Sequence, residues 1–215
     1  MSGNADGGLS AYLDQVAAGT PVPGGGSVAA LVGALAAALG EMVANLTLGR
    51  EKYAEAEALL RPARDRLTVL RASLLDGAAE DEAAYQSYRE AASLQHTGDA
   101  EKTARTDAMQ QALIAATDVP LAAARSAHEV AEILQSVARE GNPHVRSDAA
   151  LGALLAEAAL RGALLNVRGN AAMLVDRELA MTYLADADLL EKAGREAAQR
   201  VYRTAMGAAE ESGFR

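Results

Sequence analysis

Apolar residues recur at helical spacing along most of the chain, and the longest such stretch runs from residue 28 to residue 46. Its large apolar residues lie three or four positions apart, so they share one stripe of an α-helix. That stripe consists of Val28, Leu31, Val32, Leu35, Leu39, Met42, Val43 and Leu46. Small residues at positions 33, 37, 40 and 44 form a second face, which another helix can approach closely. This pattern predicts a central helix that is buried on nearly all sides.

The same spacing predicts helices over residues 10–18, 54–93, 101–140 and 176–212, and a further helix that begins at Ser147. Alanine and leucine dominate the 50% apolar fraction, aromatic residues make up only 3%, and regular β-branched runs are absent. The sequence therefore predicts an all-α fold, an elongated helical bundle around the Ala/Gly-rich central helix.

One domain is the natural count for a chain of 215 residues. We expect residues 9–215 to form it and residues 1–8, which are polar and Gly-rich, to be disordered. Pro62 and Pro120 each fall within a predicted helix. Because proline lacks an amide hydrogen and clashes with the preceding turn, each should kink or interrupt its helix.

A segment of distinct composition, TPVPGGGS, occupies residues 20–27 in front of the central helix. Gly24, Gly25 and Gly26 can adopt positive φ or let a ligand approach the backbone, and Ser27 is the expected N-cap. No strand precedes the glycines and no GK[ST] follows them, so neither a dinucleotide-binding loop nor a P-loop is indicated. Two interpretations remain: a simple tight turn, or exposed helix amides that hold a carbonyl or carboxylate of a ligand.

Charge and composition narrow the possible partners. The formal net charge of −9 argues against nucleic acid. The chain has no cysteine and its three histidines show no metal-ligand spacing, so we expect no metal site. The N-terminus lacks the basic region of a signal peptide. Residues 28–46 are long enough to span a membrane, but Glu41 and Asn45 interrupt them. We expect a cytoplasmic protein with no membrane partner.

Several pieces of the sequence, in order, resemble the folate cyclodeaminase/cyclohydrolase family. They are PVPGGGSVAAL and ALGEMVANLTLGREKY, then AEDEAAY, TDVPL, GNPHVRSD and NVRGN, and together they span about residues 9–179. The family includes the C-terminal domain of formiminotransferase-cyclodeaminase and free-standing methenyltetrahydrofolate cyclohydrolases. One piece departs from the family pattern, because residues 94–96 are LQH where relatives commonly carry LPK.

The resemblance makes Asp81 the expected catalytic residue, since it aligns with the acid regarded as catalytic in the family. From the residues alone, an acid within an acidic run on a helix is typically a solvated surface group. Tyr85 lies one helical turn further on and shares the face of Asp81. Glu80 and Glu82 are direct neighbours of Asp81, so we expect them to point elsewhere on the helix.

Other candidates have both a functional and a structural interpretation. Lys52 belongs to a stretch that resembles the family's GxxKY segment, which lies near the substrate in relatives, but a cation after a helix also complements the helix dipole. Ser147 and Asp148 match the family, although helix capping suffices to explain them. Asn166 and Asn170, at i and i+4, indicate a polar network for the edge of a bicyclic ring, or else contacts between helices. The complete predicted substrate-binding set is Pro23, Gly24, Gly25, Gly26, Ser27, Lys52, Tyr85, Asn142, Arg146, Ser147, Asp148, Asn166 and Asn170.

The resemblance implies chemistry at the carbon that bridges N5 and N10 of tetrahydrofolate, with no cofactor beyond the folate substrate. Carboxylates, asparagines and helix amides suit general acid–base catalysis. We expect a methenyltetrahydrofolate cyclohydrolase, because TDVPLAAAR and NLTLGREKY look most like the free-standing enzymes. The alternatives are a formimino-tetrahydrofolate cyclodeaminase and a non-catalytic folate-binding protein. The resemblance and the small-residue faces also imply a homodimer, with the active site near the subunit interface.

Overall fold

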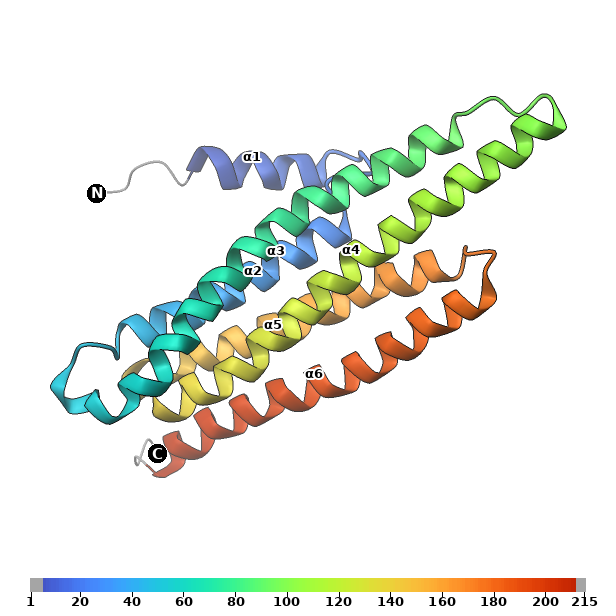
Figure 1. Ribbon diagram of the computed structural model, residues 1–215. Helices are drawn as coiled ribbons and strands as arrows, with labels where there is room; N and C mark the ends of the chain where they lie inside the picture. Colours follow the sequence, from blue (N-terminus) through green and yellow to red (C-terminus); the bar gives the residue numbers. More distant parts are fainter. Residues whose placement is uncertain (1–5, 212–215) are drawn as a thin grey trace.

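The computed structural model describes residues 6–211, and within this range the chain forms helices and no strands (Figure 1). The elements are α1 (Asp6–Ala17), α2 (Gly25–Asn45), the 3₁₀ helix η1 (Glu51–Ala56), α3 (Glu57–Ala92), α4 (Asp99–Glu140), the 3₁₀ helix η2 (Pro143–Val145), α5 (Arg146–Ala171) and α6 (Arg177–Glu211). The predicted all-α class is confirmed. Of the residues expected to be disordered, 1–5 lie outside the described part, whereas Asp6, Gly7 and Gly8 belong to α1.

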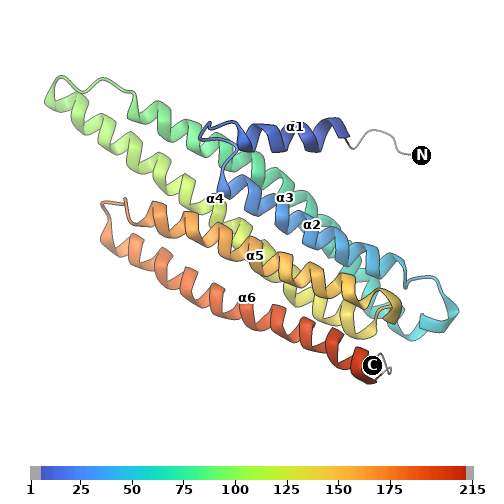
Figure 2. The ribbon, with the colours of Figure 1, turned by 180° about the vertical axis from the view of Figure 1, so that it is seen from behind.

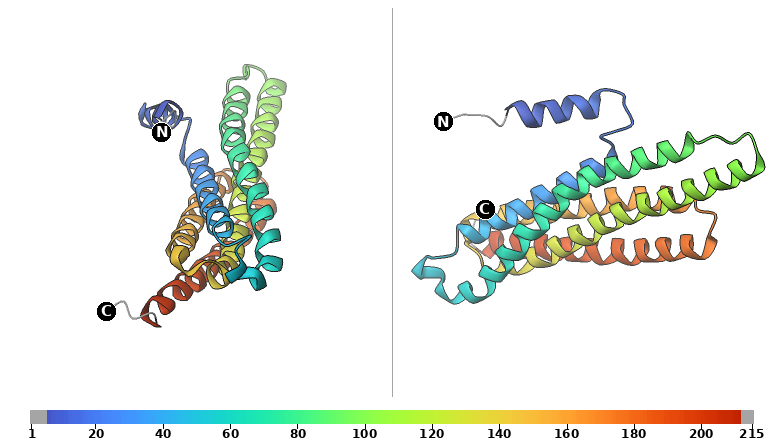
Figure 3. Two further views of the ribbon diagram at one scale, coloured as in Figure 1. Left: turned by 90° about the vertical axis from the view of Figure 1, so that its left-hand side faces the viewer. Right: turned by 45° about the horizontal axis from the view of Figure 1, so that its top comes forward.

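Four long antiparallel helices form the body of the molecule. α2 packs on α3 and α5, and α4 packs on the same two helices, so the four close into a bundle that α6 covers along α4 and α5 (Figure 2). The hairpin of α3 and α4 extends beyond α2 and α5 at one end, and α1 projects away from the bundle (Figure 3). Pro62 and Pro120 lie inside α3 and α4, which continue through them.

The small face of α2 packs into the core, together with Val43 from the stripe of large residues. A Cβ added to Gly40 would lie 2.7 Å from Leu134 and 2.8 Å from Leu67, so both leucines occupy the space that the glycine leaves. The close helix approach expected from the small residues is thus present. The expectation of burial on nearly all sides is wrong, because Leu35 and Met42 are 52% and 37% exposed.

Two expected helix caps are also wrong. α2 begins at Gly25 with Gly24 as its N-cap, so Ser27 lies inside the first turn, because glycines 25 and 26 adopt helical conformation. α5 begins at Arg146, one residue before the expected cap Ser147. The preceding 3₁₀ turn is capped by Asn142, whose Oδ1 accepts a hydrogen bond from the His144 amide.

Two stretches are long and apolar enough to cross a membrane by length and composition, Gly25–Asn45 and Pro143–Ala171. About half of each window is buried inside the bundle, as is common for core helices of globular domains.

Candidate active site

A pocket of about 300 Å³ lies at the N-terminal end of α2, where the segment that joins α1 to α2 meets α3, α4 and α5. Such a volume is in the range of small-molecule sites. The pocket is lined by Pro21, Val22, Gly24, Gly25, Gly26, Asp81, Tyr85, Tyr88, Leu113, Ala116, Asn166, Asn170 and Met173. Seven of the predicted site residues are therefore gathered around one cavity, namely Gly24, Gly25, Gly26, Asp81, Tyr85, Asn166 and Asn170.

Asp81 points from α3 to the first turn of α2. A Cβ placed on Gly26 would lie 2.5 Å from both Cγ and Oδ2 of Asp81, so the carboxylate fills the space beside that glycine. Burial raises the pKa of Asp81 above its ordinary value, a hydrogen bond from the Ser27 backbone amide opposes this, and the nearby charge of Glu82 adds to the rise. The pocket thus holds a partly desolvated carboxylate, which is the form of group that acid–base catalysis requires.

Two tyrosines continue the face of α3 that carries Asp81. Tyr85 and Tyr88 follow it at i+4 and i+7, and both line the pocket. Sequence reasoning identified Tyr85 and missed Tyr88. The signal was present, since Asp81, Tyr85 and Tyr88 share one helical periodicity that leads into a cavity. Tyrosine rings offer apolar surface with a polar hydroxyl at the tip.

Asn166 and Asn170 form the α5 side of the pocket. The Nδ2 atom of Asn166 donates to the Gly162 carbonyl at 3.1 Å, and that of Asn170 donates to the Ala116 carbonyl of α4 at 2.7 Å. The Asn170 bond joins α5 to α4, as the structural interpretation expects, whereas the Asn166 bond stays within α5. These bonds fix the two side chains, and in the described part of the chain neither Oδ1 atom accepts a hydrogen bond. Both oxygens are acceptors that a ligand can use.

The three glycines at positions 24–26 line the pocket, but they do not have the positive φ that the sequence allows for them. Gly24 has an extended conformation with φ of −114°, and the described glycines with positive φ are Gly19 and Gly49. The contribution of this segment is close approach rather than a left-handed turn. Pro23 is buried and Ser27 is fully buried, and neither of these predicted residues lines the cavity.

Glu82 does not line the pocket, but it faces α2 beside the site. Its Oε1 atom accepts a hydrogen bond from the Ser27 hydroxyl at 3.2 Å, and that hydroxyl also lies 3.0 Å from the Tyr12 hydroxyl. Neighbouring positions on α3 therefore both face α2, with Asp81 at the Ser27 amide and Glu82 at the Ser27 hydroxyl. Neither Glu82 nor Tyr12 was identified from the sequence, because the contact depends on where α2 begins.

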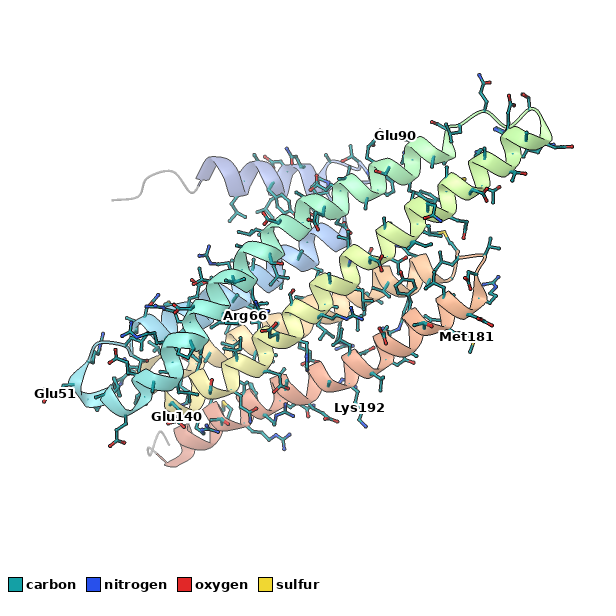
Figure 4. The ribbon with its side chains drawn as sticks, in the orientation of Figure 1. Glu51, Arg66, Glu90, Glu140, Met181 and Lys192 are labelled. Carbon is teal, nitrogen blue, oxygen red and sulfur yellow. The ribbon has the colours of Figure 1, made fainter. Side chains whose placement is uncertain are left out.

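The other five predicted residues lie at the opposite end of the bundle. They are Lys52, Asn142, Arg146, Ser147 and Asp148, and they belong to η1 and the junction of α4 with α5. Figure 4 marks that end by Glu51 and Glu140, whereas Glu90 lies on α3 toward the other end. α2, with 21 residues, separates the two ends by roughly 30 Å. In one chain these five residues do not reach the pocket.

At that far end, Asn142 has structural contacts that sequence reasoning did not foresee. Its backbone amide donates to the Thr47 hydroxyl at 2.8 Å, and its side-chain Oδ1 accepts from the Tyr53 hydroxyl at 3.1 Å. Arg146 donates through Nε to the Ala138 carbonyl at 2.8 Å. These bonds join the C-terminal end of α2 to the α4–α5 junction and account for both residues without a ligand.

Comparison with known proteins places the fold and the pocket in one family. The sequence profile of the family described as formiminotransferase-cyclodeaminase matches residues 8–189, which include every pocket residue. The chain belongs to this family. The methenyltetrahydrofolate cyclohydrolase of Methylorubrum extorquens is 42% identical over 95% of this chain and 97% of that protein.

Two further members of the formiminotransferase-cyclodeaminase family are similar over most of the chain. The formimidoyltransferase-cyclodeaminase of Gallus gallus is 34% identical over 79% of this chain, which spans 31% of that longer protein. The crystal structure of formiminotetrahydrofolate cyclodeaminase from Thermotoga maritima superposes with a TM-score of 0.84 at 29% identity, and it covers 94% of this chain and 96% of that one.

The segment that departs from the family's LPK pattern lies at the tip of the α3–α4 hairpin. His96 is exposed there and contacts the Leu94 carbonyl, and Lys102 pairs with Asp99 at 3.1 Å on the first turn of α4. Neither residue lines the pocket. Within residues 6–211, no three His, Asp or Glu side chains gather in a way that would hold a metal ion.

Proposed function

We propose that this chain is a methenyltetrahydrofolate cyclohydrolase, which adds water to 5,10-methenyl-tetrahydrofolate and yields 10-formyl-tetrahydrofolate. The observation that carries the proposal is the partly desolvated Asp81 carboxylate in a pocket at the N-terminus of α2. The near full-length similarity to a cyclohydrolase supports the same reaction.

The reaction needs one group that accepts and returns a proton. In the proposed mechanism, Asp81 takes a proton from a water molecule as its oxygen attacks the cationic methenyl carbon. The resulting hydroxyl adduct is neutral. The C–N5 bond then breaks, N5 receives the proton held by Asp81, and loss of the hydroxyl proton leaves the formyl group on N10. One proton is released overall. The carboxylate charge also stabilises the cationic substrate.

The remaining pocket residues are assigned to substrate binding. The Oδ1 atoms of Asn166 and Asn170 provide acceptors for the amino and amide hydrogens at the edge of the pterin ring. Tyr85 and Tyr88 provide surface for its faces, and Gly25 lets the ring approach α2. No cofactor besides the folate is required by this scheme, and we expect the protein to act in the cytoplasm without nucleic acid or membrane partners.

A second candidate is the formimino-tetrahydrofolate cyclodeaminase reaction, which closes the same ring and expels ammonia. The similarity to the Thermotoga maritima enzyme favours it, at lower identity than the cyclohydrolase. The near-ultraviolet absorbance of methenyl-tetrahydrofolate separates the possibilities. Enzyme-dependent loss of that absorbance supports the cyclohydrolase. Its formation from the formimino substrate supports the deaminase, and a spectral shift without turnover means that the protein only binds folate.

We further propose that the enzyme is a homodimer. Large apolar side chains stay exposed on α2 and α5, which lie side by side in Figure 2, and these are Leu35, Met42, Leu151, Leu154 and Leu165. Apolar side chains that gather on one face of a protein are typical of an interface. Light scattering should give about twice 22.2 kDa. A monomer of full activity at every concentration would contradict the dimer.

A dimer would also give the distant candidates a role. Because Lys52, Asn142, Arg146, Ser147 and Asp148 lie roughly 30 Å from the pocket of their own chain, we expect any contact from them to the substrate to come from the second copy. Mixing a Lys52→Ala variant with an Asp81→Asn variant tests this. Hybrid dimers should regain activity, since one of their two sites then has both side chains intact.

A further inference from the structure

Within the described residues, Tyr12 is the residue of α1 that forms a hydrogen bond to the bundle. Among residues 8–17, every residue except Tyr12 is exposed, and the large side chains Leu9 and Leu13 are 56% and 57% exposed. Figure 3 shows α1 projecting from the other helices. A 12-residue helix on its own is marginal in water, so α1 depends on its attachment.

The attachment is a directed chain of hydrogen bonds. The Glu82 carboxylate only accepts, so the single hydroxyl hydrogen of Ser27 is donated to it. Ser27 Oγ must then accept from Tyr12, whose hydroxyl is the donor in the 3.0 Å contact. The chain therefore runs from Tyr12 through the fully buried Ser27 to Glu82, and its last bond is strengthened by the carboxylate charge.

This chain closes a loop in the backbone around one wall of the pocket. Tyr12 on α1 and Ser27 on α2 flank residues 18–24, and within that segment Pro21, Val22 and Gly24 line the cavity. The segment has one internal side-chain bond, from the Thr20 hydroxyl to the Val22 carbonyl at 2.8 Å. The hydrogen-bonded ends of the loop thus limit where the wall can lie.

We propose that Tyr12 and Glu82 are positioning residues that hold the Pro21–Gly24 wall against the folate substrate, with Ser27 as the link between them. Neither residue lines the pocket, so neither is expected to contact the reacting atoms. The proposal rests on the proposed function, because one of its readouts is the KM for the folate substrate. Its second readout, amide hydrogen exchange in α1, needs no turnover.

Removing the hydrogen-bonding group of Tyr12 or of Glu82 should loosen both α1 and the Pro21–Gly24 wall. In Tyr12→Phe and in Glu82→Ala, we expect the KM for methenyl-tetrahydrofolate to rise about fivefold, the effect of one lost hydrogen bond, while kcat on the pH plateau stays near wild type. Amide hydrogen exchange in α1 should accelerate by a similar factor. Glu82→Gln keeps an acceptor for the Ser27 hydroxyl, so its KM and its exchange rate in α1 should stay near wild type.

Matched controls separate this role from general effects of substitution. Tyr202→Phe changes a half-exposed tyrosine on α6, and Glu80→Ala changes an exposed acid next to Asp81 on α3, so both should match wild type. If the KM or the amide exchange of α1 is unchanged in Tyr12→Phe, the Tyr12–Ser27–Glu82 hydrogen bonds do not position the wall and the proposal is overturned. A wild-type chain with neither turnover nor folate binding would instead contradict the proposed function, a failure visible before any variant is made.

Discussion

The carboxylate of Asp81 occupies the space where a side chain on Gly26 would begin. A Cβ on Gly26 would lie 2.5 Å from Cγ and Oδ2 of Asp81, which is shorter than the non-bonded contacts that Cβ atoms make. The absence of a side chain at position 26 is therefore what lets α3 bring an acid to the amides at the start of α2. Of the three successive glycines, this one has a requirement that concerns the proposed catalytic group directly.

Replacing Gly26 should therefore act through Asp81. In Gly26→Ala, the carboxylate must move away from α2, and we expect kcat to fall at least about tenfold with helicity retained, because acid–base catalysis depends on position. Steady-state kinetics and circular dichroism measure the two properties. Gly77→Ala is the control, since a Cβ there meets nothing within 4 Å and alanine favours the helix. Equal kinetics in both variants would contradict the account.

The raised pKa of Asp81 makes a prediction about stability. A carboxyl whose folded-state pKa lies above its unfolded value stabilises the fold when protonated, and that contribution is lost as pH rises through the folded pKa. At neutral pH the buried charge is thus a cost, and Asp81→Asn should raise Tm. The gain should shrink as the pH falls toward and below the ordinary aspartate range. A lower Tm at pH 7 would mean that the Ser27 amide and the helix dipole outweigh burial.

Glu82 should tune the pH dependence of the reaction. Its negative charge raises the pKa of Asp81, so Glu82→Gln should lower that pKa and move the acid limb of kcat/KM to lower pH. The other titratable side chains that line the pocket are Tyr85 and Tyr88, both on α3, and α2, α4 and α5 contribute none to the lining. An unshifted profile would contradict this role of Glu82.

Local patterns in the sequence predicted the helices well and their packing less well. Apolar periodicity gave the long helices within a few residues, because an amphipathic stripe is a local property. It did not tell which face of α2 is the inner one. Leu35 is half exposed while Gly33 and Gly40 are buried, since the leucines of α3 and α4 fill the space beside the glycines. That choice depends on the partner helices.

The candidate site divides in the same way. The family resemblance and the helical spacing identified Asp81, Tyr85, Asn166 and Asn170, and these four residues line one pocket. The role of Glu82 was missed, because it depends on Ser27 being inside α2 rather than at its cap. Asn142, a predicted substrate-binding residue, instead caps η2 and bonds to Thr47 and Tyr53, which are distant in sequence.

The central claim is that Asp81 moves the protons, and turnover of methenyl-tetrahydrofolate by Asp81→Asn tests it most directly. Asparagine keeps the size of the side chain and removes the proton acceptor, so kcat should fall roughly 10²–10⁴-fold while folate still binds. Glu80→Gln, on the exposed side of the same turn, should keep wild-type turnover. If Asp81→Asn retains most of its kcat, the carboxylate is not the acid–base group and the proposed mechanism is wrong.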